Sequence, residues 1–119
     1  MESKTTGFAS PAQGYEEQSI DLNRLLIHNP SATYFLRLET AEMESVGLPQ
    51  GSLLIVDRSI DPAPNLYVLI RHENRLLCRL MVKQKGKTKF TNGKTDIIPI
   101  PDETEIFGTV TAYIKEYKK

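Results

Sequence analysis

The residue types that bind metal ions or act as strong nucleophiles are scarce in this chain. It holds one cysteine, Cys78, and two histidines, His28 and His72, which lie in separate segments. A metal site needs several such ligands at short, regular spacings, and none occurs here. The glycine-rich loops that cradle phosphates are also missing. We therefore expect no metal, no cofactor and no small-molecule ligand, with both histidines as ordinary side chains and Cys78 as a buried apolar residue.

One basic cluster offers a different chemistry. Between positions 83 and 94 the chain carries Lys83, Lys85, Lys87, Lys89 and Lys94. Alternate residues of a strand share a face, so a strand or hairpin would present several of these lysines on one side. Such a strip fits phosphate contact. It fits equally a solvated hairpin whose charge discourages edge-to-edge pairing with other sheets.

The overall composition narrows the class of protein. The chain has 119 residues with 15 basic and 15 acidic side chains, which gives a formal net charge of zero. This length predicts one domain. Zero net charge argues against a partner held mainly through phosphates, and we expect no direct sequence-specific DNA binding. No apolar run is long enough to cross a membrane and no secretory signal is present, so we expect a cytoplasmic protein.

The elements that must position these residues begin after a polar arm. Residues 1–18 contain glycine, proline and small polar residues without an apolar period, which predicts an extended or disordered arm before a domain at 19–119. Asp21 is a suitable N-cap for a short helix over 21–27, with leucines at helical spacing. Pro30 should end that helix by His28.

The remaining segments read as strands. Apolar alternation or short apolar runs bounded by turn residues occur at 32–39, 52–57, 66–72, 75–83, 89–93, 96–102 and 105–117. Glu73-Asn74 and the region of Gly86 are suited to tight hairpin turns. We predict a mostly-β domain, folded as a curled sheet or partial β-barrel with one short N-terminal helix.

Three segments of the sequence carry a family resemblance. The segment GFASPAQGYEEQSIDLNRLLIHNPSATYF (7–35) and the run LLIVD (53–57), with EIFGTV (105–110), resemble the UmuD family in its processed form, which begins at the glycine corresponding to Gly7. UmuD belongs with the LexA-type self-cleaving serine peptidases. The resemblance implies the β-rich fold of the LexA C-terminal domain. It also implies self-cleavage by a serine nucleophile and a lysine base.

The positions of that dyad hold other residues here. In the family the serine precedes a methionine, in a motif resembling Gly-Asp-Ser-Met, whereas this chain has Thr40-Ala41-Glu42-Met43. The nucleophile position therefore holds Glu42. Counting without gaps from LLIVD, the lysine position falls on Arg79, and a guanidinium stays protonated and cannot act as a base. We expect a pseudo-peptidase with no catalytic residues.

The cleavage junction differs as well. The family cuts after alanine or cysteine and before glycine, whereas Thr6 precedes Gly7 here, with only six residues upstream. A rescue by Ser45, two residues beyond Met43, would need a different loop and another base. We expect nothing to be cut at the Thr6–Gly7 junction.

The double replacement suggests a specific contact. Glu42 and Arg79 occupy positions that lie within hydrogen-bond reach of each other in the family. One hypothesis is that an ion pair has taken the place of the nucleophile–base pair and plugs the cleft. The alternative is that both residues changed independently and point into water.

The resemblance also implies partners. Processed UmuD is a homodimer that joins a UmuC-type polymerase in SOS mutagenesis, so we expect a non-catalytic accessory subunit for translesion DNA synthesis that needs no activation by a RecA filament; that filament is a further candidate partner. Candidate dimer or partner contacts are Leu22, Asn23, Leu26, Phe107 and Tyr113. Core packing is the other explanation for the helix leucines. An active self-cleaving peptidase and an orphan repressor-type dimerisation domain are the alternative functions.

Overall fold

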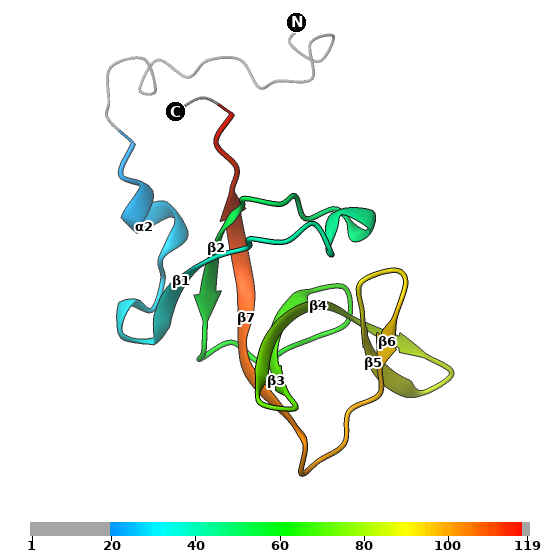
Figure 1. Cartoon of the computed structure of the whole chain (residues 1–119). Helices are drawn as coiled ribbons and strands as arrows, with labels where there is room; N and C mark the ends of the chain where they lie inside the picture. Colours follow the sequence, from blue (N-terminus) through cyan, green and yellow to red (C-terminus); the bar gives the residue numbers. More distant parts are fainter. Residues whose placement is uncertain (1–19, 118–119) are drawn as a thin grey trace, which may run out of the picture.

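The computed structural model describes residues 20–117 as one antiparallel sheet, with short helical turns before its first strand and between its first two strands (Figure 1). The helical elements are α2 (Leu22–Leu26), η2 (Pro30–Ala32) and η3 (Glu44–Val46). The strands are β1 (Thr33–Arg37), β2 (Leu53–Asp57), β3 (Tyr67–His72), β4 (Arg75–Gln84), β5 (Lys87–Thr91), β6 (Asp96–Ile97) and β7 (Thr104–Ile114). The mostly-β prediction is confirmed. The predicted arm at 1–18 lies outside the described residues.

The sheet is open and strongly curled. Its strand order is β1-β2-β7-β3-β4-β5-β6, so the last strand in sequence lies between β2 and β3. The register shifts between Ile55 and Val56 where β2 meets β7, and between Leu69 and Ile70 where β3 meets β7. Such bulges increase the local twist of a sheet. In Figure 1 the β3–β6 half turns away from the β1–β2 half, with β7 running between them.

The curl gives the sheet two buried faces. One cluster packs Leu54, Leu69 and Cys78 against Met43 and Leu48 of the segment between β1 and β2. A second cluster lies on the other face and contains Val68, Ile70 and Phe90. Consecutive residues of β4 therefore alternate between two apolar environments, as the pleat of a strand requires. The prediction that Cys78 is buried is confirmed.

Two tight turns set the register of β4. Glu73 and Asn74, between β3 and β4, have φ of 52° and 64°, and Lys85 and Gly86, between β4 and β5, have φ of 52° and 77°. Two successive residues at positive φ match the twist of a two-residue hairpin. Both predicted hairpins are present.

Helix α2 begins at the predicted N-cap, but its leucines are not packed in the core as one of the two explanations required. The Asp21 carboxylate accepts hydrogen bonds from the backbone N–H groups of Asn23, at 3.0 Å, and Arg24. The helix buries none of its residues, and Leu22 and Leu25 are 56% and 58% exposed. Core packing therefore does not explain Leu22 and Leu25, whereas Leu26 is half-buried. No helix among residues 20–117 is long and apolar enough to span a membrane.

Candidate functional site

Residues 38–52 form a closed loop that carries Glu42. The backbone N–H of Leu38 donates to the Ser52 carbonyl at 2.9 Å, and the Gly51 N–H donates to the Leu38 carbonyl at 2.7 Å, so the loop is pinned where it leaves the sheet. Met43 and Leu48 are fully buried and anchor it in the core. The loop therefore positions Glu42, the residue just before its apolar anchor, against the body of the sheet.

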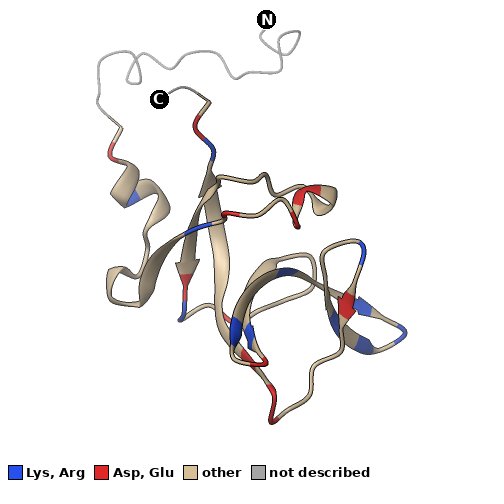
Figure 2. Cartoon of the chain, viewed as in Figure 1, with Lys and Arg blue, Asp and Glu red and all other residues tan. Residues whose placement is uncertain are grey.

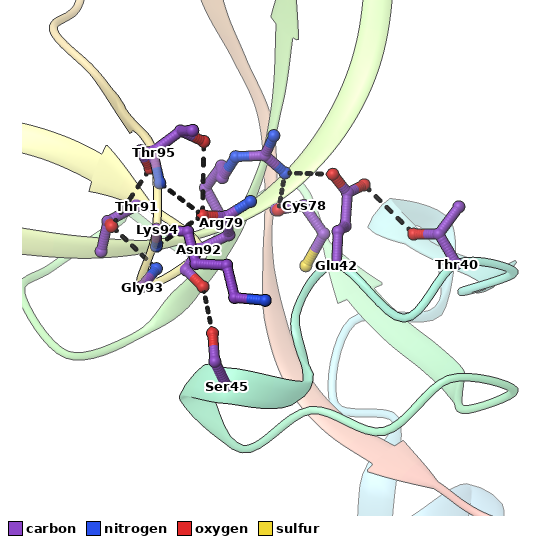
Figure 3. A network of polar contacts seen from close by, with 10 residues as sticks. All are labelled: Thr40, Glu42, Ser45, Cys78, Arg79, Thr91, Asn92, Gly93, Lys94 and Thr95. Carbon is purple, nitrogen blue, oxygen red and sulfur yellow. Dashed lines mark hydrogen bonds and ion pairs between the residues drawn. The ribbon is translucent and has the colours of Figure 1, made fainter.

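Glu42 meets Arg79 of β4. Glu42 Oε1 lies 3.1 Å from Arg79 Nη1, and the same nitrogen donates to the Cys78 carbonyl at 2.8 Å (Figure 3). Thr40 donates to the other carboxylate oxygen at 3.2 Å. The ion pair hypothesised from the sequence is therefore present, and the alternative in which both side chains point into water is wrong.

The pair is asymmetric in its exposure to water. The Arg79 side chain is 7% exposed and that of Glu42 is 33% exposed. Arg79 Nε is buried and has no hydrogen-bond partner among the described residues. A buried cation without a counter-charge is costly, so the Glu42 carboxylate is what allows a guanidinium to occupy this place.

A hollow of about 190 Å³ lies beside the ion pair. Its walls are mostly apolar and come from Leu36, Leu38, Leu54, Leu69 and Cys78, with Glu42 at the polar side. β1, which supplies Leu36, is an edge strand of the sheet. The hollow is thus mostly apolar, and its polar lining comes from Arg37, Glu39, Thr40 and Glu42.

Cys78 reaches this hollow as an unreactive thiol. Burial raises its pKa to about 12 from an ordinary value near 9, with Arg79 opposing the rise and Glu42 adding to it. The thiolate is the nucleophilic form, and at neutral pH such a group is almost wholly protonated. At neutral pH Cys78 is therefore a buried, protonated thiol.

Ser45 lies near the site and makes a structural contact. Its hydroxyl donates to the Asn92 carbonyl at 2.5 Å, which ties the loop to the turn after β5 (Figure 3). The Asn92 side chain in turn accepts from the backbone N–H groups of Lys94 and Thr95, at 2.9 and 2.8 Å. A peptide carbonyl is not a base, so this hydroxyl is oriented and not activated. Local sequence does not indicate this contact, because it joins residues 47 positions apart along the chain.

A second polar cluster missed from the sequence fastens the N-terminal segment to the sheet. Asn29 Nδ2 donates to Asp57 Oδ2 at 2.9 Å, and the Ser59 N–H and hydroxyl donate to Asp57 Oδ1 at 2.8 and 2.6 Å. These bonds, that from Asn29 first, lower the pKa of Asp57 below its ordinary value. In the sequence, Asn29 directly before Pro30 was the available indication of this cluster.

The histidines take ordinary positions. His72 Nδ1 lies 2.9 Å from Thr104 Oγ1 and is half-buried, while His28 is exposed. Among residues 20–117 no three side chains of the metal-ligating types gather in one place.

The residues predicted for partner contact fall in three places. Leu22 and Asn23 are exposed on α2 and Leu26 is half-buried there. Phe107 is half-buried, with its ring centroid 5.6 Å from that of Tyr34 and the Arg58 guanidinium 4.4 Å above it. Tyr113 is 42% exposed near the end of β7. Thr6 and Gly7 lie outside the described residues.

Comparison with known proteins agrees with this architecture. Residues 1–111 match the family described as peptidase S24-like. Protein MucA from Salmonella typhimurium and from Escherichia coli is 33% identical over 117 residues, covering 95% of this chain and 80% of MucA. Protein SamA from Salmonella typhimurium is 35% identical over 109 residues, 91% of this chain and 77% of SamA. These relatives are UmuD-like proteins, and the chain belongs to the peptidase S24-like family.

Proposed function

We propose that this chain is a non-catalytic, UmuD′-like accessory subunit that acts in mutagenesis by protein–protein interaction with a UmuC-type polymerase. The observation that carries the proposal is the Glu42–Arg79 ion pair, at 3.1 Å, at the positions that the resemblance assigns to the nucleophile and the base. The family relationship to UmuD-like proteins supports the role in mutagenesis.

The chemistry of the pair argues against peptide cleavage. Serine–lysine cleavage needs a hydroxyl that loses its proton and an amine that accepts it. Arg79 is a guanidinium, which holds its proton throughout the accessible pH range. Glu42 presents a carboxylate that is already bonded to that guanidinium and to Thr40. Neither role of the dyad is filled by these two side chains.

The nearby nucleophile types are accounted for as well. The raised pKa of Cys78 keeps its thiol protonated. The Ser45 hydroxyl donates a hydrogen bond to the Asn92 carbonyl. Self-cleavage at this site would therefore need a nucleophile and a base other than these side chains.

Self-association is supported by apolar side chains left exposed near β1. Leu22 and Leu25 of α2 and Phe35 of β1 are each more than half exposed. Figure 1 shows α2 beside β1 at the edge of the sheet. We propose that this face is the homodimer contact, because paired apolar surfaces leave water together.

Incubation at pH 9 tests the non-catalytic assignment. Intact-mass spectrometry over a day is expected to show only the full-length chain, and S45A is expected to behave identically. Fragments from the wild type that vanish in S45A would contradict the proposal and identify Ser45 as a nucleophile.

Sedimentation of matched variants tests the homodimer. Leu25 and Ile98 are almost equally exposed, at 58% and 59%, and lie in different parts of the chain. We expect a dimer for the wild type and for I98E at micromolar concentration, and a monomer for L25E. A monomeric wild type would contradict the proposed contact.

Co-purification with a UmuC-type polymerase separates the accessory subunit from a repressor-type dimerisation domain. The accessory subunit is expected to retain the polymerase on a column. A chain that dimerises and retains none would be the dimerisation domain alone.

A further inference from the structure

β4 and β5 continue beyond the rest of the sheet as a two-stranded ribbon. β3 pairs with β4 only as far as Leu80, and the backbone of 65–66 bonds to Met81. β6 pairs with β5 only at Phe90 and Thr91. Residues 82–89, which we call the β4–β5 ribbon, therefore pair only with each other. In Figure 2 the tip of this hairpin is blue with lysine.

The ribbon carries positive charge on both of its faces. Directly paired residues share a face, and Lys83 pairs with Thr88, whereas Lys87 pairs with Gln84. Lys85 lies in the turn between them. The expectation that several lysines share one face holds only for Lys87 and Lys89. Lys83 lies on the other face, because the two-residue turn reverses the alternation. The turn converts a predicted strip into a ribbon that is basic on two sides and at its tip.

Most of this charge is unpaired. Lys89 bonds to Asp96 at 2.9 Å and is neutralised. Lys83, Lys85 and Lys87 are exposed, and no ion pair among the described residues includes them. Three ammonium groups without an ion-pair partner among the described residues therefore lie exposed on the ribbon and its turn.

The neutral net charge of the chain hides this local excess. The opposite end of β4 adjoins an acidic group, Glu73, Asp102, Glu103 and Glu105, which lines one hollow with Arg71. A strand of ten residues spans about 30 Å, several times the Debye length of about 8 Å at physiological salt. The acidic end therefore does little to cancel the field at the ribbon.

We propose that the β4–β5 ribbon binds duplex nucleic acid through its phosphates, without reading sequence. The major groove admits a two-stranded β-ribbon, and its two walls are phosphate backbones. Lysines on both faces and at the tip suit a partner with negative charge on two sides. A flat acidic protein surface would meet only one face. This binding goes beyond the proposed polymerase partnership and does not depend on it.

Fluorescence anisotropy with a labelled 20-base-pair duplex of random sequence tests the proposal with the purified chain alone. Three phosphate contacts predict a slope of log K against log salt of about −2.7, or roughly 40-fold weaker binding at 200 mM than at 50 mM NaCl. K83Q/K85Q/K87Q is expected to bring the slope close to zero. An unchanged slope in this variant, or no binding by the wild type at 50 mM, would overturn the proposal.

A matched pair of single variants controls for loss of charge as such. Lys85 and Arg75 are both exposed and lie at opposite ends of β4. K85Q is expected to make the slope shallower by about 0.9, and R75Q to leave it unchanged. Equal effects would overturn the assignment to the ribbon. Thermal unfolding of each variant confirms that the fold is kept.

Two competitors separate the classes of partner. A single strand of the same length that binds as tightly as the duplex would overturn groove binding, and so would poly-glutamate competing equally at equal charge. Weaker competition by both supports it. Because no polymerase is present, a failure here leaves the proposed function standing, and loss of polymerase co-purification leaves this result standing.

Discussion

Arg79 and Lys83 lie on the same face of the same strand, four residues apart, and have opposite surroundings. Arg79 is 7% exposed and bonded to Glu42 and to the Cys78 carbonyl. Lys83 is exposed, with no ion-pair partner among the described residues. Strand β3 and the 38–52 loop cover the first position, whereas only β5 accompanies the second. Coverage by segments distant in sequence thus decides whether a cation on β4 is buried and paired or exposed to water.

The same contrast separates two kinds of contact with a partner. A buried charge is held in one geometry and cannot reach out, while an exposed one on a long stem adapts to an incoming anion. β4 therefore joins a covered segment, which holds Arg79, to a ribbon of exposed lysines.

Removing the counter-charge at the covered end should have the largest effect. E42A leaves the Arg79 guanidinium buried without a counter-charge. We expect the free energy of unfolding to fall by about 2–3 kcal/mol in urea titrations. The value lies at the low end for buried pairs because Glu42 is one-third exposed.

The double variant E42L/R79M is the control for this loss. It removes both charges and is expected to return to within about 1 kcal/mol of the wild type, since apolar residues of similar volume often replace buried ion pairs well. A loss below about 0.5 kcal/mol in E42A would place the pair among ordinary surface contacts.

Alanine at two glycines compares the turn after β5, which contacts the 38–52 loop, with the turn at the tip of the β4–β5 ribbon. Gly93 and Gly86 have φ of 91° and 77°, which strains any L-residue. A Cβ at Gly93 would lie 2.6 Å from Ser45 Oγ, and one at Gly86 would meet no atom within 4 Å. We expect losses of about 2 kcal/mol for G93A and about 1 kcal/mol for G86A, by thermal unfolding. Equal losses would mean that the loop does not press on the turn after β5.

Alkaline pH should weaken the fold through Cys78. The thiol pKa is about 12 in the folded chain and near 9 when unfolded, so the unfolded state loses its proton first. The contribution to stability is complete below about pH 9 and declines as pH rises toward 12. We expect a loss of about 1 kcal/mol between pH 8 and 10 that is absent in C78A. The same decline in both proteins would assign it to other groups.

The smallest effect on stability is expected in the β4–β5 ribbon. K83Q/K85Q/K87Q removes three solvated charges that contact no acid among the described residues, and we expect the free energy of unfolding to stay within about 0.5 kcal/mol. A larger loss would show that the lysines support the fold.

Local signals predicted most of the elements. The N-cap at Asp21, the apolar run of β2 and the Glu73-Asn74 turn depend on neighbouring residues, and all three are present. The final strand was predicted over 105–117 and ends at Ile114, because β2 supplies partners only that far. Strand ends depend on the neighbouring strand, which local sequence does not contain.

The candidate site was predictable only in part. The Glu42–Arg79 contact followed from a family resemblance, whereas the Ser45–Asn92 bond had no local signal and the Asp57 cluster had only Asn29 before Pro30 to indicate it. The helix leucines left two explanations open for a related reason. Their spacing is the same whether a helix packs inward or leaves its apolar side in water.

By itself the sequence determined most of the strands, the turns, the presence of Glu at position 42 and Arg at position 79, and a net charge of zero. Only the tertiary structure decided which charges are covered. The loop around Glu42 folds over Arg79, while no strand but β5 follows β4 to its end. Burial is a property of contacts between distant segments, so among residues 20–117 Arg79 is covered and paired with Glu42, whereas the lysines at 83, 85 and 87 stay exposed.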